Sequence, residues 1–90
     1  MSTQRRIETL KQIEQLICVD RPAVYGDADR NLNDTAKAWS VYLNHEISAT
    51  DVCCMMALMK VLRLKASKDH RDSMLDAAGY MAIAASMEKP

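Results

Sequence analysis

Four segments of the chain repeat their apolar residues at helical spacing. Over 2–19 the repeat consists of residues three or four positions apart, namely Ile7, Leu10, Ile13 and Ile17. Over 31–43 a similar stripe contains Leu32, Ala36, Trp39 and Leu43. Polar side chains occupy the remaining directions of both segments, so each is predicted to be an amphipathic helix that covers a core.

The third and fourth predicted helices, over 48–65 and 71–87, have apolar side chains in nearly every direction. Ser48 and Asp51 form a capping-box pattern, which predicts where the third helix begins. Small residues surround Gly79 in the fourth helix, where a glycine costs about 0.8–1 kcal/mol relative to alanine. Close packing or a nearby ligand would explain a glycine at this position.

Residues 20–30, between the first two helices, break the helical pattern. Pro22 and Gly26 favour turns, and aspartates accompany them. We predict a functional loop here, because Arg21 and Tyr25 are suited to ligand contact and binding groups are often carried on loops. The alternative interpretation is that Tyr25 fills the edge of the core.

Length and apolar content together favour self-association. One domain over 1–90 buries only roughly two-thirds of its unfolded surface, so its core is small. Three cysteines form neither a disulfide framework nor a metal cage. We therefore expect an all-α, four-helix domain that assembles through its third and fourth helices as a homodimer or a higher homo-oligomer.

The charge balance narrows the classes of partner. Lys plus Arg and Asp plus Glu each number 12, which argues against a strongly basic nucleic-acid binder. The first residues are polar and basic, and no apolar run is long enough to span a bilayer, so we expect no membrane partner. The free thiols fit a reducing cytoplasm.

Charged residues interrupt the apolar third and fourth helices. Lys60 and Arg63 are three residues apart, so their charged groups can converge. Asp72 and Asp76 share a stripe with Tyr80 on the fourth helix. Because burying an unpaired charge costs several kcal/mol, these groups are expected to pair with one another or to meet a ligand.

Two interpretations of these charges stay open. The first is a closed ion network within the protein. The second is a pocket between the third and fourth helices, roofed by 20–30, in which cations bind phosphate, aromatic rings contact a base and the acids orient the cations or hold Mg²⁺. Its candidate ligand-binding residues are Arg21, Tyr25, Asn31, Trp39, Lys60, Arg63, Asp72, Asp76 and Tyr80.

Signatures of catalysis are sparse. Two glycines leave no Gly-rich phosphate loop, and nothing arranges Ser, His and Asp as a triad. Attack of an Mg²⁺-activated water on phosphorus is the reaction that best suits the acids, with Asp72 and Asp76 as candidate metal ligands. We assign no catalytic residue.

Residues 20–80 contain short motifs that together resemble a known family. The motifs include Tyr25-Gly26-Asp27, Trp39-Ser40-Val41-Tyr42-Leu43, Asp51-Val52, Met55-Met56, Lys60, Arg63-Leu64, His70-Arg71-Asp72-Ser73 and Ala78-Gly79-Tyr80. On these motifs the chain resembles a small helical domain of unknown function borne by phages and prophages. The resemblance implies a phage protein that works in the host cytoplasm.

That domain is similar, more distantly, to the all-α nucleoside triphosphate pyrophosphatases of the MazG type. Those are helical oligomers that bind a nucleotide and Mg²⁺ in a helix-lined cleft, with the acidic pairs Glu-x-x-Glu and Glu-x-x-Asp on consecutive helices. Here Asp51 is followed by Cys54 where the second acid belongs, and Asp72 and Asp76 are four residues apart instead of three.

The resemblance therefore implies a MazG-like helical oligomer that binds a nucleotide or a nucleotide-derived ligand and need not hydrolyse it. Such binding would serve phage nucleotide metabolism, or would sequester a nucleotide signal of host defence. One alternative is an interaction module that blocks a host protein through an exposed Met/Ala surface. A further alternative is an Mg²⁺-dependent nucleotide pyrophosphohydrolase.

Overall fold

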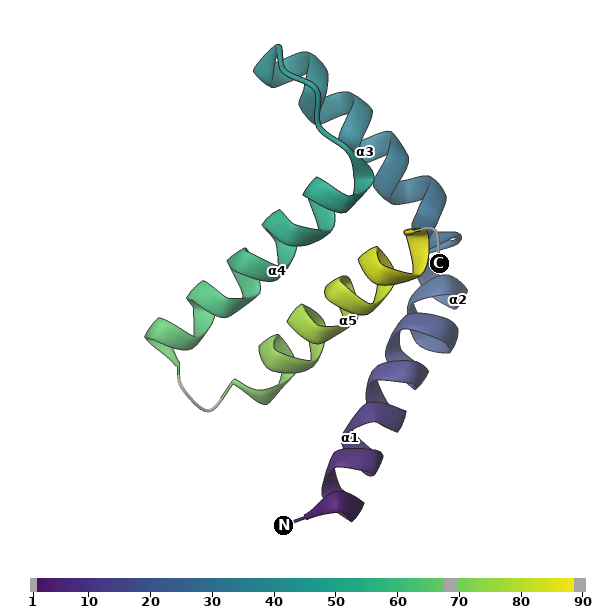
Figure 1. The fold of residues 1–90 in the computed structure, drawn as a ribbon, viewed down its shortest axis with the longest axis vertical. Helices are drawn as coiled ribbons and strands as arrows, with labels where there is room; N and C mark the ends of the chain where they lie inside the picture. Colours follow the sequence, from purple (N-terminus) through teal and green to yellow (C-terminus); the bar gives the residue numbers. More distant parts are fainter. Residues whose placement is uncertain (1, 68–69, 89–90) are drawn as a thin grey trace.

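The computed structural model describes residues 2–67 and 70–88. The side chains of Val24 and Tyr25 lie outside this description. The described residues form helices and no strand, as expected for an all-α fold (Figure 1). The elements in chain order are α1 (Thr3–Gln15), the π-helical segment η1 (Leu16–Asp20), α2 (Arg21–Tyr25), α3 (Ala28–Leu43), α4 (Ala49–Ala66) and α5 (Arg71–Met87).

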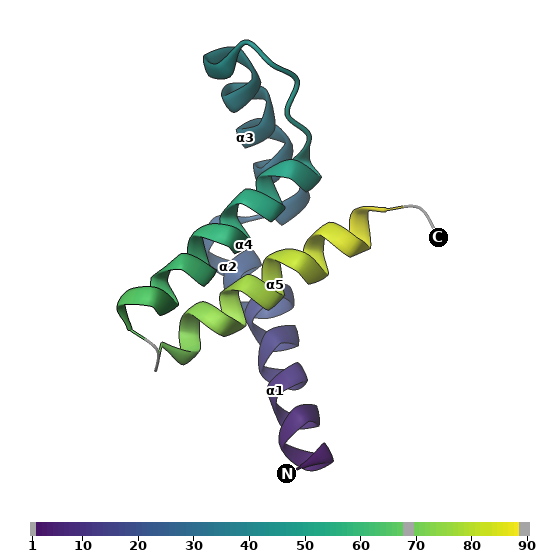
Figure 2. The same cartoon turned by 60° about the vertical axis from the view of Figure 1, so that its left-hand side comes forward.

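An antiparallel pair of helices, α4 and α5, forms the centre of the molecule and has the most extensive helix–helix contact. α3 packs mainly on the N-terminal part of α4, and α1 packs on α5 away from α4 (Figures 1 and 2). α5 therefore lies between α4 and α1, which contact it from different sides.

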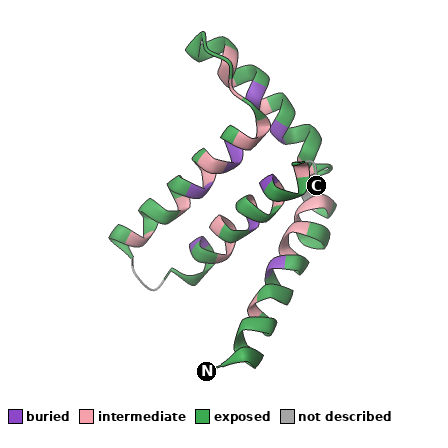
Figure 3. Ribbon diagram, in the orientation of Figure 1, coloured by how far each residue is buried: buried purple, intermediate pink, exposed green. Residues whose placement is uncertain are grey.

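The buried core is small and lies where α3, α4 and α5 meet. Its cluster of buried residues is Leu32, Ala36, Val52, Cys53 and Ala84. Figure 3 shows that buried positions are few and that exposed positions are the most numerous class along α1, α3, α4 and α5. Burial raises the pKa of the Cys53 thiol, and proximity to Cys54 and Asp29 raises it further.

The prediction of a loop over 20–30 is wrong for most of its length. The backbone is helical from Thr3 to Tyr25, and α3 begins at Ala28 instead of residue 31. The N–H of Arg21 bonds to the carbonyl of Leu16, five residues earlier, so one turn is wider than in an α-helix. Pro22 lies directly after this π turn, where the regular α-helical hydrogen-bond ladder is already interrupted.

The helix ends explain the true break in the chain. Gly26 has φ 81°, a left-handed value that glycine adopts without steric cost, and it ends α2. Asp27 caps α3 by accepting a hydrogen bond of 3.0 Å from the N–H of Asp29. The break is therefore confined to residues 26 and 27.

The capping box predicted at Ser48 is confirmed. The Ser48 hydroxyl accepts a hydrogen bond of 3.0 Å from the Asp51 N–H, and the Asp51 carboxylate accepts one of 2.9 Å from the Ser48 N–H. α4 runs over Ala49–Ala66, close to the predicted 48–65. α5 occupies 71–87 as predicted, and the ring Nδ1 of His70 caps it by accepting from the N–H of Ser73.

Close packing explains Gly79. A Cβ atom built on Gly79 would lie 2.9 Å from Cγ2 of Ile17, a distance shorter than van der Waals contact. α5 can therefore approach η1 closely only because residue 79 has no side chain.

Replacing Gly79 by alanine is expected to lower the free energy of unfolding by about 1 kcal/mol. The gain in helix propensity of about 0.8–1 kcal/mol is outweighed by overpacking against Ile17, which costs about 1–3 kcal/mol. Chemical denaturation of Gly79→Ala, Ile17→Ala and the double variant measures this. In the double variant the clash is removed, so the two losses should be less than additive. A more stable Gly79→Ala single variant would contradict the close contact.

The capping box should make stability depend on pH through Asp51. Hydrogen bonds from the Ser48 backbone N–H and hydroxyl lower the pKa of this carboxyl. The wild type should therefore be more stable than Asp51→Asn above about pH 4, near the ordinary pKa of an unfolded aspartate, and should lose this advantage as the pH falls through the lower folded pKa. Urea unfolding at pH 7, 5 and 3 checks the trend. Asp34→Asn, which removes an exposed carboxylate within α3, is the control for the loss of one negative charge, and the pH trend of Asp51→Asn should exceed the trend of this control.

Candidate ligand-binding pocket

A pocket of about 380 Å³ opens where the helical segments around α5 meet. Its walls come from η1, α2, α3, α4 and α5, so segments from most of the chain contribute. The residues that line it are Ile17, Arg21, Gly26, Ala28, Asn31, Leu32, Thr35, Trp39, Val52, Met56, Tyr80 and Ile83. The lining is mainly apolar, with a few polar groups, which is typical of small-molecule sites.

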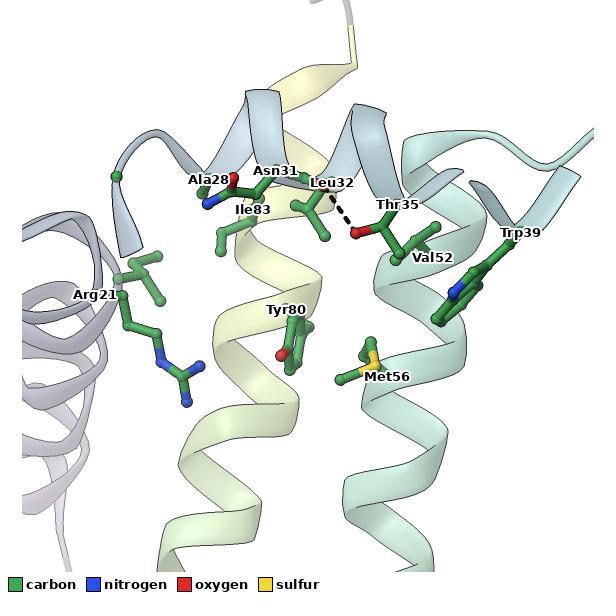
Figure 4. Close-up of a pocket in the computed structure, with 12 residues that line it drawn as sticks. Arg21, Ala28, Asn31, Leu32, Thr35, Trp39, Val52, Met56, Tyr80 and Ile83 are labelled. Carbon is green, nitrogen blue, oxygen red and sulfur yellow. Dashed lines mark hydrogen bonds between the residues drawn. The ribbon is translucent and has the colours of Figure 1, made fainter. Parts of the chain in front are cut away.

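One face of α3 supplies the longest wall of this pocket. The contributing positions follow helical spacing, namely Ala28, Asn31, Leu32, Thr35 and Trp39. The Thr35 hydroxyl donates a hydrogen bond of 2.8 Å to the Asn31 carbonyl one turn earlier (Figure 4). Because this bond occupies the hydroxyl proton, Thr35 presents its methyl group and oxygen lone pairs to other neighbours.

The polar and aromatic groups of the pocket are separated across it. Figure 4 shows Arg21 at one side, Trp39 at the other and Tyr80 between them. The Arg21 side chain is 37% exposed, so its guanidinium group remains accessible to a ligand. A ligand that fills the pocket can therefore contact aromatic rings and a cation at the same time.

A three-residue ion cluster lies beside the pocket. Lys60 Nζ lies 2.9 Å from Asp76 Oδ2, and Arg21 Nη2 lies 3.2 Å from Asp76 Oδ1. The side chains of Lys60 and Asp76 are only 12% and 15% exposed. One carboxylate is shared by two cations, so this cluster carries a formal net charge of +1.

The comparisons with known proteins identify the family. The model of a family described as a domain of unknown function, DUF6378, matches residues 8–88. The chain belongs to this family. No solved structure is significantly similar to it.

Relatives of this DUF6378 chain occur in mycobacteriophages. The Gene 55 protein of Mycobacterium phage D29 is 44% identical over 71 residues, which cover 79% of this chain and 47% of that protein. The Gene 55 protein of Mycobacterium phage L5 is 34% identical over 82 residues, or 90% of this chain and 53% of the relative. The chain thus spans about half the length of these relatives, and the expected likeness to a small phage domain of unknown function is confirmed.

The structure brings together part of the predicted site. Arg21, Asn31, Trp39 and Tyr80 line the pocket, although they come from three different helices, α2, α3 and α5. Lys60 and Asp76 pair with each other beside it. The side chain of Tyr25 lies outside the described residues, so its predicted contact with a base is not placed.

Two of the predicted residues lie elsewhere. Arg63 is exposed on α4 and does not line the pocket, so it does not converge with Lys60 on a common site there. Asp72 is also exposed, and it lines a different cleft, between α1 and α5, together with Asp20 and Asp76. The second cation of the ion cluster is therefore Arg21, from a segment that the sequence analysis treated as a loop.

The apolar wall of the pocket was not included among the predicted site residues. Leu32, Val52, Met56 and Ile83 were interpreted as core or left unassigned. The spacing of Leu32 with Trp39, of Val52 with Met56 and of Tyr80 with Ile83, each on one helix, carried a usable signal, because residues on the same helix face contact the same neighbour. The spacing alone does not distinguish a filled core from a hollow one.

A cluster of metal-ligating side chains and a membrane-spanning helix are both absent from the described residues. Within 2–67 and 70–88, no three His, Cys, Asp or Glu side chains are grouped closely enough to hold a metal ion. None of the helices over the same residues has both the length and the apolar content that a bilayer crossing requires.

Replacing Asp76 by asparagine should destabilise the protein strongly, because it leaves the mostly buried Lys60 without a counter-ion. The expected loss is about 3 kcal/mol, near the lower end of the range for buried ion pairs since both groups retain some contact with water. Asp72→Asn is a matched control one turn earlier on α5, and its loss should stay below about 1 kcal/mol. Chemical denaturation of both variants checks this. Equal losses would mean that the ion cluster contributes nothing specific.

Proposed function

We propose that this chain is a MazG-like helical domain that binds a nucleotide or a nucleotide-derived small molecule in the pocket between α3, α4, α5 and the η1–α2 segment. The base would occupy the apolar part near Trp39 and Tyr80, and a phosphate would lie at Arg21. Asn31 would contact the ligand from α3. This proposal is consistent with the occurrence of relatives in phages, and it assigns a class of ligand to the pocket.

The observation that carries the proposal is the excess positive charge beside an aromatic-lined pocket. Asp76 neutralises one of its two cationic neighbours, and the more exposed of the two, Arg21, also lines the pocket. Guanidinium groups bind phosphate oxygens through two parallel N–H donors, which gives both affinity and orientation. Lys60, which is mostly buried, stabilises the position of the Asp76 carboxylate by pairing with it.

The size and composition of the pocket fit this class of ligand. About 380 Å³ lies within the usual range for small-molecule sites and is too small for a folded macromolecule. Trp39 and Tyr80 offer aromatic surface for a flat ring, and contacts of this kind are worth roughly 1–3 kcal/mol per base in single-strand binders.

Binding without hydrolysis is the form of the proposal that the acidic residues favour. Asp51 is engaged in the capping box at the start of α4, and Asp72 faces the cleft between α1 and α5. Asp76 is paired with two cations. A reaction that needs several carboxylates around Mg²⁺ would require these groups to converge, so sequestration of a nucleotide is preferred over its cleavage.

The test compares nucleosides with nucleotides. Isothermal titration with a panel of nucleosides, their mono- and triphosphates and cyclic oligonucleotides should find at least one nucleotide that binds about 10–100-fold more tightly than its nucleoside. A ligand at 100 times its Kd should also stabilise the fold by about 2.7 kcal/mol. Arg21→Gln should remove the advantage of the phosphate and leave the affinity for the nucleoside. Arg63→Gln, which changes an exposed arginine away from the pocket, should leave both affinities unchanged.

A second variant separates the pocket from the ion cluster. Thr35→Met should fill the space between α3 and Tyr80 and so weaken nucleoside and nucleotide alike, without touching Asp76. The proposal fails if no member of the panel binds to the folded wild type. It also fails if a nucleotide binds and Arg21→Gln and Thr35→Met both bind it as well as the wild type.

A further inference from the structure

The outer face of α4 carries a continuous apolar stripe. Met55, Leu58, Met59 and Leu62 occupy positions i, i+3, i+4 and i+7, and each is between 39% and 66% exposed. We call these four residues the outer stripe of α4. Their spacing is that of a helix face that packs against another helix, yet the buried residues of α4, namely Val52, Cys53 and Ala57, point in other directions.

The outer stripe continues onto the C-terminal end of α3. Trp39, Tyr42, Leu43 and Met55 line a shallow hollow of about 370 Å³, and Tyr42 is 88% exposed. An apolar surface that runs across two helices is larger than the scattered single residues that are normal on a monomer. Such a surface indicates contact with another protein.

The overall dimensions agree with an incomplete core. The radius of gyration is 14.3 Å, whereas a compact domain of this length has about 12 Å. The chain extends over 46 × 30 × 28 Å, so a large part of it lies far from the small buried cluster. Further apolar burial therefore has to come from outside the single chain.

The charged residues beside the outer stripe are complementary to a second, antiparallel copy of the same helix. At about 100° per residue, Asp51 and Lys65 lie on the same flank of the stripe as Leu58, one at the N-terminal end of α4 and one near its C-terminal end. A second copy placed antiparallel brings Asp51 of one chain near Lys65 of the other, at both ends of the interface. In a parallel copy, related by a two-fold axis along the helices, the flanks that carry Asp51 and Lys65 lie on opposite sides of the interface, so these charges do not meet.

We propose that two copies of this chain pack α4 against α4, antiparallel, around a two-fold axis that passes near Leu58 and Met59. In this arrangement the partner subunit's Leu62 lies opposite Met55 and enters the hollow at the end of α3. The same contact occurs twice because the interface is symmetric. Both the apolar surface and the two charges are then matched by a single partner.

The dimer and the ligand pocket use different sides of α4. Val52 and Met56 line the pocket, and neither belongs to the outer stripe. Trp39 lines both the pocket and the hollow, so it connects the two surfaces. The dimer does not depend on the proposed nucleotide, and either proposal can fail without the other.

Sedimentation equilibrium tests the dimer. The wild type should sediment at twice the chain mass of 10.1 kDa. Leu58→Glu, which places a carboxylate next to the two-fold axis, should raise the dissociation constant about 30-fold or more. Val61→Glu is the matched control, because Val61 is also exposed on α4 and lies outside the stripe. It should leave the dimer intact, and circular dichroism should show that both variants are helical.

A charge exchange tests the antiparallel orientation and does not rely on Leu58. Lys65→Glu and Asp51→Lys should each weaken self-association about five-fold, since each places like charges across the interface. An equal mixture of the two variants should associate more tightly than either alone, because both ion pairs are restored in the mixed dimer. A monomeric wild type overturns the proposal, as does a dimer that Leu58→Glu and Val61→Glu affect equally. A mixture that associates no better than its components overturns the orientation.

Discussion

The carboxylate of Asp76 is the interaction on which the arrangement of this chain depends. It accepts hydrogen bonds from Lys60 of α4 and Arg21 of α2 while belonging to α5 itself, so one group joins three elements of the fold. The apolar core between α3, α4 and α5 is small and is made largely of short side chains. In such a protein a mostly buried ion pair defines how the helices are oriented, because a shifted helix would leave a charge without a partner.

The regular part of the fold could be predicted from the sequence because its signals are local. A capping box and an apolar repeat are read within a few residues, and α4 and α5 lie close to where these signals put them. The prediction of a loop after Val19 was wrong because it also relied on local signals. Proline, glycine and aspartate are typical of turns. Here, however, Pro22 follows a π turn within a continuous helical segment, and no local sequence pattern predicts a π turn.

The candidate site was predictable only in part. Helical spacing gives the direction of a side chain around its own helix, but it does not show which other segment that side chain contacts. Lys60 and Asp76 were expected among the interacting charges, and they do pair. Arg63 was expected beside Lys60, yet three residues along a helix is also about 60° around it, enough to move a side chain from an interface to the surface. Arg21 reaches Asp76 across 55 positions of sequence, and only the tertiary structure brings them together.

The π turn in η1 contains one extra residue in the middle of a long helical segment. The N–H of Arg21 bonds to the carbonyl of Leu16 five residues earlier, so this turn holds one residue more than an α-helical turn would. Loss of one residue between Leu16 and Asp20 would therefore let the segment close into a regular α-helix without turning Arg21 away from Asp76. An equal deletion within a regular α-helix would instead turn every later side chain by about 100°. The chain can thus lose one residue here and still present the same guanidinium group to Asp76.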